Sequence, residues 1–183
     1  GVSMVALAGV LVLGILKGVM LAAVVSLLLL IRRAARPHVA FLGRIPGFRG
    51  LSDMERNPAN VPVPGTLVFR VEAALLYFNV AHVYDVVWAK VRASAAPVRL
   101  VVCDLSATPQ VDVAGARILA KLHGELESAG IRLRLAGAHA TVRDILRAEG
   151  LEERAGYFGR RVTAVDVVDE FEGLARSAPS RVM

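Results

Sequence analysis

The sequence has one cysteine and few aromatic residues in its 183 positions, and its first 31 positions contain no acidic residue. The single cysteine, Cys103, excludes an internal disulfide and fits a reducing compartment. It ends the apolar run Val98 to Cys103, so we expect a small buried side chain and not a nucleophile. No cysteine or histidine cluster has metal-ligand spacing, and we therefore expect no metal site. The histidines stand singly, at His38, His82, His123 and His139.

Phosphate-binding glycine motifs are also missing, since neither G-x-x-x-x-G-K-[ST] nor G-x-G-x-x-G occurs. The net charge of +6 could suggest a nucleic-acid partner. The bases are spread along the chain without interleaved aromatic residues, so we expect no nucleic acid. An anionic membrane surface close by accounts for them better. We predict a regulatory or assembly module with no catalytic residue and no cofactor, and not an enzyme.

Residues 1–31 hold one base, Lys17, and are otherwise almost entirely apolar. About 20 apolar residues suffice to cross a bilayer. A signal peptide is excluded because no charge precedes the apolar run and arginines end it. A single helix would place Lys17 near the bilayer centre, which is costly. We predict a break between Gly14 and Gly18, giving a short helix and then a second one to about Ile31.

Small residues recur at every fourth position of this segment and form a strip along one helical face. This spacing argues against a clean break. It predicts packing on neighbouring membrane helices that the chain does not contain. The strip consists of Gly14, Gly18, Ala22 and Ser26.

Arg32, Arg33 and Arg36 follow the apolar run directly. We interpret them as anchors at the membrane interface, in preference to a specific lipid site. By the positive-inside bias, the domain after them is cytosolic. The chain begins with Gly instead of Met, so we expect a fragment of a longer protein.

The remaining residues alternate between strand and helix patterns, which predicts an α/β fold with a parallel or mixed sheet covered by helices. Alternating or apolar runs predict strands, and caps at Asn79, Asp112, Thr141 and Thr163 predict helices. The strands expected are 37–43, 66–72, 98–103 and 131–137, with a weaker candidate at Tyr157-Phe158. The expected organisation is a transmembrane segment at 1–33, a linker with the first strand at 34–65, a domain at 66–176 and a disordered tail at 177–183.

The most informative stretch runs from Asp104 to Gly115, between a buried strand and a helix. Ligands and partners bind at this edge in open α/β sheets. Asp104 and Ser106 can hold the turn, Asp112 can cap the helix, and Gly115 permits a close approach. On spacing alone, a purely structural role in the turn and cap is the better explanation of these residues.

The pattern D-L-S-x-x-P-x-V-D-x-x-G in this stretch resembles the signature of STAS domains, which occur in anti-sigma-factor antagonists and in sulfate-permease-type (SulP) anion transporters. Leu75-Leu-Tyr-Phe-Asn79 is similar to a stretch of the transporter domains, and the apolar segment with its arginines looks like their last membrane helices. The resemblance implies a STAS-like mixed sheet preceded by a transmembrane segment or hairpin. The antagonists are phosphorylated just after the second Asp, where this chain has Val113 and Ala114.

The resemblance further implies the C-terminal part of a secondary-active anion transporter for sulfate, bicarbonate or dicarboxylates. Its STAS domain would serve assembly and regulation, and the intact protein would be multi-pass in the inner or plasma membrane. Upstream transporter helices, a homodimer partner and a protein partner or nucleotide at the Asp104–Gly115 edge are expected. The alternative is a stand-alone membrane-anchored STAS protein that binds a signalling partner.

Overall fold

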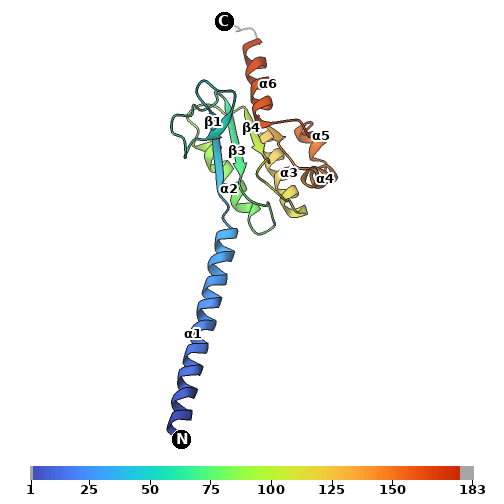
Figure 1. The fold of residues 1–183 in the computed structure, drawn as a ribbon. Helices are drawn as coiled ribbons and strands as arrows, with labels where there is room; N and C mark the ends of the chain where they lie inside the picture. Colours follow the sequence, from blue (N-terminus) through green and yellow to red (C-terminus); the bar gives the residue numbers. More distant parts are fainter. Residues whose placement is uncertain (1, 178–183) are drawn as a thin grey trace. The chain divides into compact units, whose positions relative to one another are not determined.

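The computed structural model describes residues 2–177. The chain divides into two compact units, Gly1–Arg36 and Pro37–Met183 (Figure 1).

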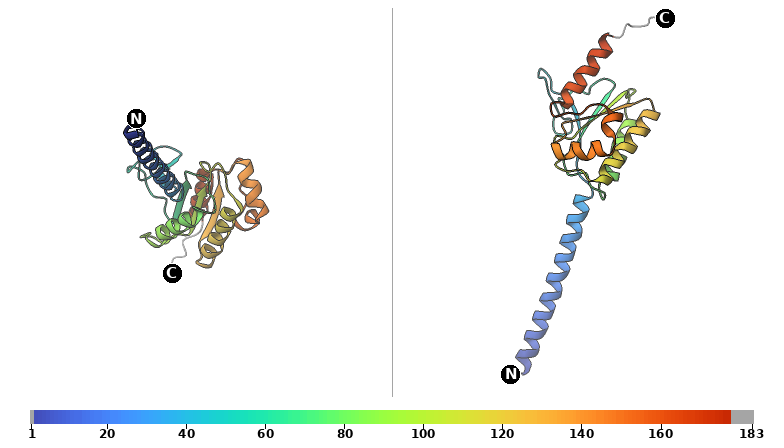
Figure 2. Two further views of the ribbon diagram at one scale, coloured as in Figure 1. Left: turned by 90° about the horizontal axis from the view of Figure 1, so that it is seen from below. Right: turned by 90° about the vertical axis from the view of Figure 1, so that its right-hand side faces the viewer.

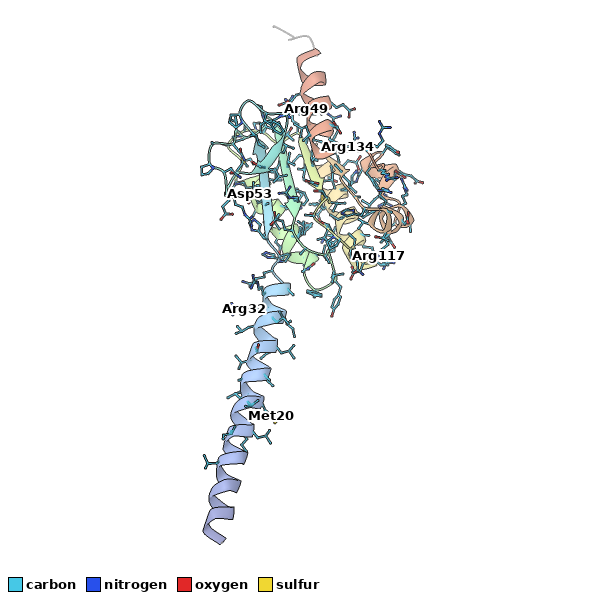
Figure 3. The ribbon with its side chains drawn as sticks, viewed as in Figure 1. Met20, Arg32, Arg49, Asp53, Arg117 and Arg134 are labelled. Atoms are coloured by element: carbon cyan, nitrogen blue, oxygen red, sulfur yellow. The ribbon has the colours of Figure 1, made fainter. Side chains whose placement is uncertain are left out.

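The first unit is a single helix, α1 (Val2–Ala34). The predicted break between Gly14 and Gly18 is wrong, because the helix continues through both glycines. An isolated glycine costs a helix only about 1 kcal/mol relative to alanine, and this segment contains no proline. The part Gly14–Ala34 is long and apolar enough to cross a membrane, with a mean hydropathy of 2.5 and none of it buried. Met20 and Arg32 mark its apolar part and its basic end in Figure 3.

The second unit is built on a five-stranded mixed sheet in the order β2-β1-β3-β4-β5, which confirms the predicted fold class. Strands β3, β4 and β5 are parallel, whereas β1 is antiparallel to both β2 and β3. The predicted linker at 34–65 contributes both β1 and β2 to the sheet. The strands are β1 (Val39–Arg44), β2 (Leu51–Asp53), β3 (Thr66–Val71), β4 (Leu100–Asp104) and β5 (Arg132–Ala136).

Helices cover both faces of this sheet (Figures 1 and 2). Alternate residues of each central strand point to opposite faces, so Val101 and Leu133 enter one core while Leu100 and Val102 enter the other. The first core is closed by α2 (Val80–Arg92), α3 (Val113–Ser128), α4 (Ala140–Ala148) and α5 (Leu151–Ala155). The second core is closed by α6 (Ala164–Ser177) alone among the described helices.

The helix starts were predicted with mixed success. Thr163 and Asp166 form the expected capping box before α6, with the Thr163 hydroxyl donating to the Asp166 carboxylate at 2.6 Å. Asn79 precedes α2, but its side chain accepts from the Leu76 amide at 2.9 Å instead of capping the helix. Thr141 does not cap α4, which begins one residue earlier after His139.

Two further expectations concern the C-terminal third of the chain. The strand at Tyr157-Phe158 is wrong: these residues are irregular, and Phe158 is fully buried in the first core. Of the predicted disordered tail, Ser177 ends α6 and the rest lies outside the described residues. Cys103 is buried as expected, and burial raises the pKa of its thiol.

Candidate functional site

The stretch Asp104–Gly115, here called the signature turn, leaves the C-terminal end of β4. Arg70, Asp104 and Ala136 are register partners on β3, β4 and β5, so the loops that follow these three strands meet at one end of the sheet. We call this the signature end. It is the predicted edge, formed by the carboxyl ends of parallel strands.

Asp104 is buried and its carboxylate organises the beginning of the turn. One oxygen accepts from the Ser106 amide at 3.0 Å, and the other lies 3.8 Å from Arg70 Nη1. Gly137 closes over the same carboxylate with φ +71°, and a Cβ added there would lie 2.8 Å from Asp104 Oδ1. The carboxylate is therefore enclosed by its own turn, while the Ser106 side chain is exposed.

Thr108 was not predicted as a site residue, yet it fixes the middle of the turn. Its side chain is fully buried, and its hydroxyl donates to the Val71 carbonyl at 3.1 Å. The bond joins the signature turn to the last residue of β3. Only its position before Pro109, within the motif, marked this residue in the sequence.

Asp112 caps α3 as expected and makes a second bond that the sequence did not reveal. One carboxylate oxygen accepts from the Gly115 amide at 2.6 Å, and the other accepts from the Tyr77 amide at 2.9 Å. The backbone adds a bridge between the same segments, because Leu75 and Val111 pair as isolated parallel partners. The two bonds and the bridge tie the segment before α2 to the start of α3.

Gly115 is required where this segment approaches α3. A Cβ at this position would lie 2.6 Å from the Leu75 carbonyl oxygen, which real Cβ contacts do not permit. The predicted close approach is therefore a contact with backbone from a segment 40 residues earlier in the chain.

An exposed aromatic and apolar group lies at the signature end, in the same set of loops as the exposed polar residues Ser106, Gln110 and His139. Tyr77 is 74% exposed, Phe78 40% and Val113 49%. The two aromatic rings pack edge to face, with centroids 5.4 Å apart. Exposed aromatic residues of this kind are enriched in protein interfaces, so the surface suits a protein partner.

A small cavity lies beside Asp104 and Ser106 and is closed on its other side by Thr163 and Ala164. Its volume of about 150 Å³ is below the 300–1,000 Å³ typical of pockets for drug-sized ligands. This size gives no support to a nucleotide at the signature end. Among the described residues, no group of three or more histidine, cysteine or acidic side chains could hold a metal ion.

The other predicted site residues lie on α1, except Arg36, which follows the helix. A Cβ at Gly14 or Gly18 would meet no atom within 4 Å, and Ala22 and Ser26 are exposed on the same helix. Arg32 and Arg33 occupy its last turn, and Arg36 follows. The structure thus leaves the small-residue strip and the arginines open for the predicted membrane contacts, which stay predictions.

A charged cluster that holds α6 was not predicted. Arg44 on β1 binds Asp169 and lies 2.8 Å from Glu172, and Arg49 (labelled in Figure 3) binds Asp169 at 2.9 Å and Asp166 at 2.7 Å. Hydrogen bonds from Thr163 and then Arg49 hold the pKa of Asp166 below its usual value. Burial by itself would raise the pKa of Asp169. Hydrogen bonds from Arg44 and Arg49 outweigh this effect, so the pKa lies below its usual value.

Comparison with known proteins assigns the domain. A family model described as "STAS domain" matches residues 57–164. The "Probable sulfate transporter Rv1739c" of Mycobacterium tuberculosis is 33% identical over 149 residues, covering 81% of this chain and 27% of that protein. The "Low affinity sulfate transporter 3" of Stylosanthes hamata is 28% identical over 171 residues, covering 88% of this chain and 27% of that protein. The chain therefore spans about a quarter of the length of these relatives.

A solved structure shows the same fold. The murine Solute Carrier 26 family member A9 anion transporter, in its inward-facing state, superposes with a TM-score of 0.70 at 20% identity. The superposition covers 85% of this chain and 26% of the transporter chain.

Proposed function

The chain belongs to the STAS domain family, and we propose that it is the C-terminal portion of a secondary-active anion transporter. Helix α1 would be the last membrane helix, and the unit from Pro37 onward would be a cytosolic domain that serves assembly and regulation. Sulfate, bicarbonate and dicarboxylates are the anions to test.

One observation carries this proposal: similarity to sulfate transporters continues across the boundary between the two units. The unit Pro37–Met183 has 147 residues, whereas 88% of the 183-residue chain is about 161. The alignment with the Stylosanthes transporter therefore includes part of α1. A domain that had merely been joined to an unrelated anchor would give no reason for this continuity.

The composition of α1 supports the membrane assignment. A helix needs about 20 apolar residues to cross the hydrocarbon core, and Gly14–Ala34 supplies 21 with none buried. Arg32 and Arg33 in its last turn support a cytosolic position for the following domain under the positive-inside bias.

The signature end supports a role in assembly. Its carboxylates are occupied by the turn itself, and the exposed surface of Tyr77, Phe78 and Val113 is apolar. We propose that this surface contacts the upstream transporter helices or a second copy of the chain.

The size of the native polypeptide tests the proposal first. Membranes from the source cells are blotted with an antibody against residues 66–176. A band several times larger than 19.5 kDa supports the transporter. A band near 19.5 kDa contradicts it and leaves a membrane-anchored STAS protein that acts through a signalling partner.

Uptake of labelled sulfate, bicarbonate and dicarboxylates by the intact protein then identifies the anion. Tyr77→Ser with Phe78→Ser should lower uptake or dissociate the dimer while the protein still reaches the membrane. Tyr157→Ser is the matched control, since Tyr157 is 65% exposed and lies outside the signature end. Equal uptake by the unmodified protein, the double variant and the control, with the dimer retained in each, would contradict a role for this surface.

A further inference from the structure

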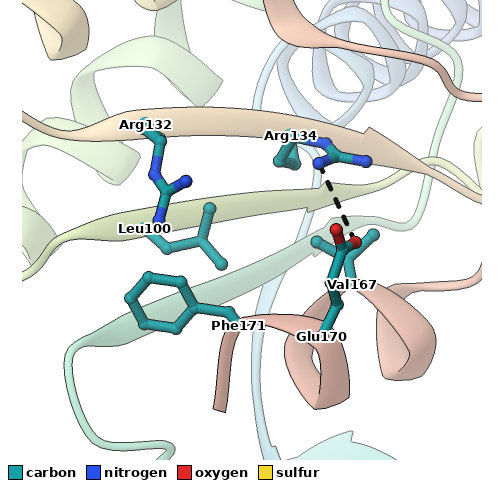
Figure 4. Close-up of a pocket in the computed structure, with 6 residues that line it drawn as sticks. All are labelled: Leu100, Arg132, Arg134, Val167, Glu170 and Phe171. Atoms are coloured by element: carbon teal, nitrogen blue, oxygen red, sulfur yellow. Dashed lines mark ion pairs between the residues drawn. The ribbon is translucent and has the colours of Figure 1, made fainter. Parts of the chain in front are cut away.

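A group of arginines gathers at the opposite end of the sheet, on the face covered by α6. Thr66, Leu100 and Arg132 are register partners at the N-terminal ends of β3, β4 and β5, away from the signature end. A small cavity opens there between β5 and α6 (Figure 4). It is lined by Leu100, Arg132, Arg134, Val167, Glu170 and Phe171, and we call it the arginine pocket.

Strand alternation explains why two arginines enter this pocket. Leu133 and Leu135 point into the first core, so Arg132 and Arg134 point to the α6 face. Arg99, just before β4, does not line the pocket but lies near the same Phe171 ring. The guanidinium carbons of Arg99 and Arg132 lie 5.6 and 5.3 Å from the centroid of the Phe171 ring.

These arginines carry positive charge that the described residues do not balance. Among residues 2–177, Arg99 and Arg132 have no carboxylate within 4.0 Å, and both side chains are exposed. Arg134 has one distant partner, with Nη1 4.0 Å from Glu170 Oε2, and its buried Nε has no hydrogen-bond partner. Three guanidinium groups thus face one carboxylate.

The contrast with the rest of α6 shows that this imbalance is local. Three other carboxylates of the helix, Asp166, Asp169 and Glu172, lie on Arg44 and Arg49 at the other side. Like charges held together around an apolar floor raise the local concentration of anions.

We propose that the arginine pocket binds a sulfate or phosphate group. Guanidinium forks match the oxygen geometry of these groups, and the Arg132 side chain lines the pocket, is exposed and has no carboxylate partner among the described residues. The cavity volume is about 70 Å³, far below the 300–1,000 Å³ of pockets for drug-sized ligands, so the pocket suits a single oxyanion group. The bound group would replace Glu170 as the partner of Arg134 and so alter how α6 is held. This inference stands on the domain alone and does not rest on the proposed function.

The test uses the full chain in nanodiscs of neutral lipid, titrated with sodium sulfate and then with sodium phosphate. Side-chain Nε–H signals of the arginines are followed by NMR at constant ionic strength, with sodium chloride as the balancing salt. Saturable shifts confined to Arg99, Arg132 and Arg134 are expected. Shifts that are linear, or that chloride reproduces, would overturn the proposal.

Variants locate the site. Arg132→Gln should weaken sulfate binding about tenfold, because it removes a charged donor. Arg132→Lys should give an intermediate loss, since it keeps the charge without the fork. Arg117→Gln is the matched control, because Arg117 is an exposed arginine on the opposite face, in α3. If Arg132→Gln does not fold, the exposed Arg99→Gln takes its place. Unchanged affinity in a folded variant would overturn the proposal.

The source of the group is separated by a second arm with nanodiscs that contain phosphatidic acid. Saturation by free sulfate or phosphate in neutral lipid assigns a soluble anion. A response confined to the phosphatidic acid nanodiscs, lost in Arg132→Gln, assigns a lipid headgroup to the same pocket. No response in either arm would overturn the proposal.

Discussion

The two ends of the sheet differ in whether their charged side chains have partners within the domain. At the signature end, Asp104 and Asp112 accept hydrogen bonds from backbone amides of the chain itself. At the other end, Arg99 and Arg132 have no carboxylate partner among the described residues. A motif that is prominent in the sequence thus holds the fold together, whereas arginines outside any motif remain free to bind. The following predictions test this division, from the largest expected effect to the smallest.

Replacement of Gly115 by alanine should lower the free energy of unfolding by about 1–3 kcal/mol, the cost of overpacking against rigid atoms. The added Cβ would lie 2.6 Å from the Leu75 carbonyl oxygen. Gly124→Ala in the same helix meets no atom within 4 Å and should instead stabilise by about 0.5–1 kcal/mol. Urea unfolding followed by circular dichroism measures both, and equal effects would contradict the close approach.

Asp112→Ala should destabilise by about 1–2 kcal/mol, because it removes the α3 cap. It also removes the acceptor of the Tyr77 amide. Asp85→Ala, an exposed aspartate on α2, is the control and should change stability little. If both variants unfold at the same urea concentration, the signature aspartate does not have the structural role assigned to it.

The bonds between Arg49 and α6 should make stability depend on acid pH. Because the folded-state pKa values of Asp166 and Asp169 are lowered, their contribution is present above the unfolded value near 4 and is lost as pH falls through the folded values. Arg49→Gln should destabilise only slightly at pH 7, since the arginine is largely exposed and its ion pairs are screened by solvent. The difference from the unmodified protein should vanish in acid, and a difference constant with pH would contradict this account.

Arg132→Gln should change the free energy of unfolding by no more than ~1 kcal/mol in chloride, because it removes only an exposed contact with the Phe171 ring and breaks no ion pair among the described residues. Sulfate should raise the unfolding temperature of the unmodified protein and not that of the variant. A large loss of stability in chloride would instead show that Arg132 is part of the fold, as the signature residues are.

Much of the domain could be predicted from local patterns. Alternation at Thr66–Val71 and the apolar run ending at Cys103 predicted β3 and β4, and the Thr163–Asp166 box and Asp112 cap lie within four residues of the amides they bind. The break in α1 was wrong because a rule about Lys17 in a bilayer was applied to the helix itself. The helix is continuous through Gly14, Lys17 and Gly18, and its backbone hydrogen-bonding pattern needs no break there.

The contacts that could not be predicted join residues far apart in the chain. Arg44 meets Asp169 across 125 positions, and Asp112 meets Tyr77 across 35. No local pattern distinguishes Arg49, which has carboxylate partners, from Arg132, which has none among residues 2–177. Their environments differ only because α6 lies across the sheet with three carboxylates toward β1 and one toward β5.

By itself, the sequence determined the apolar helix, the alternating strands and helices, and the signature turn, because these depend on side-chain periodicity and on capping over a few residues. The tertiary structure decided which charged side chains have a partner within the domain and which remain available to bind a ligand. That outcome depends on the order of the strands and on the face that α6 covers, and both are set by packing of the whole core.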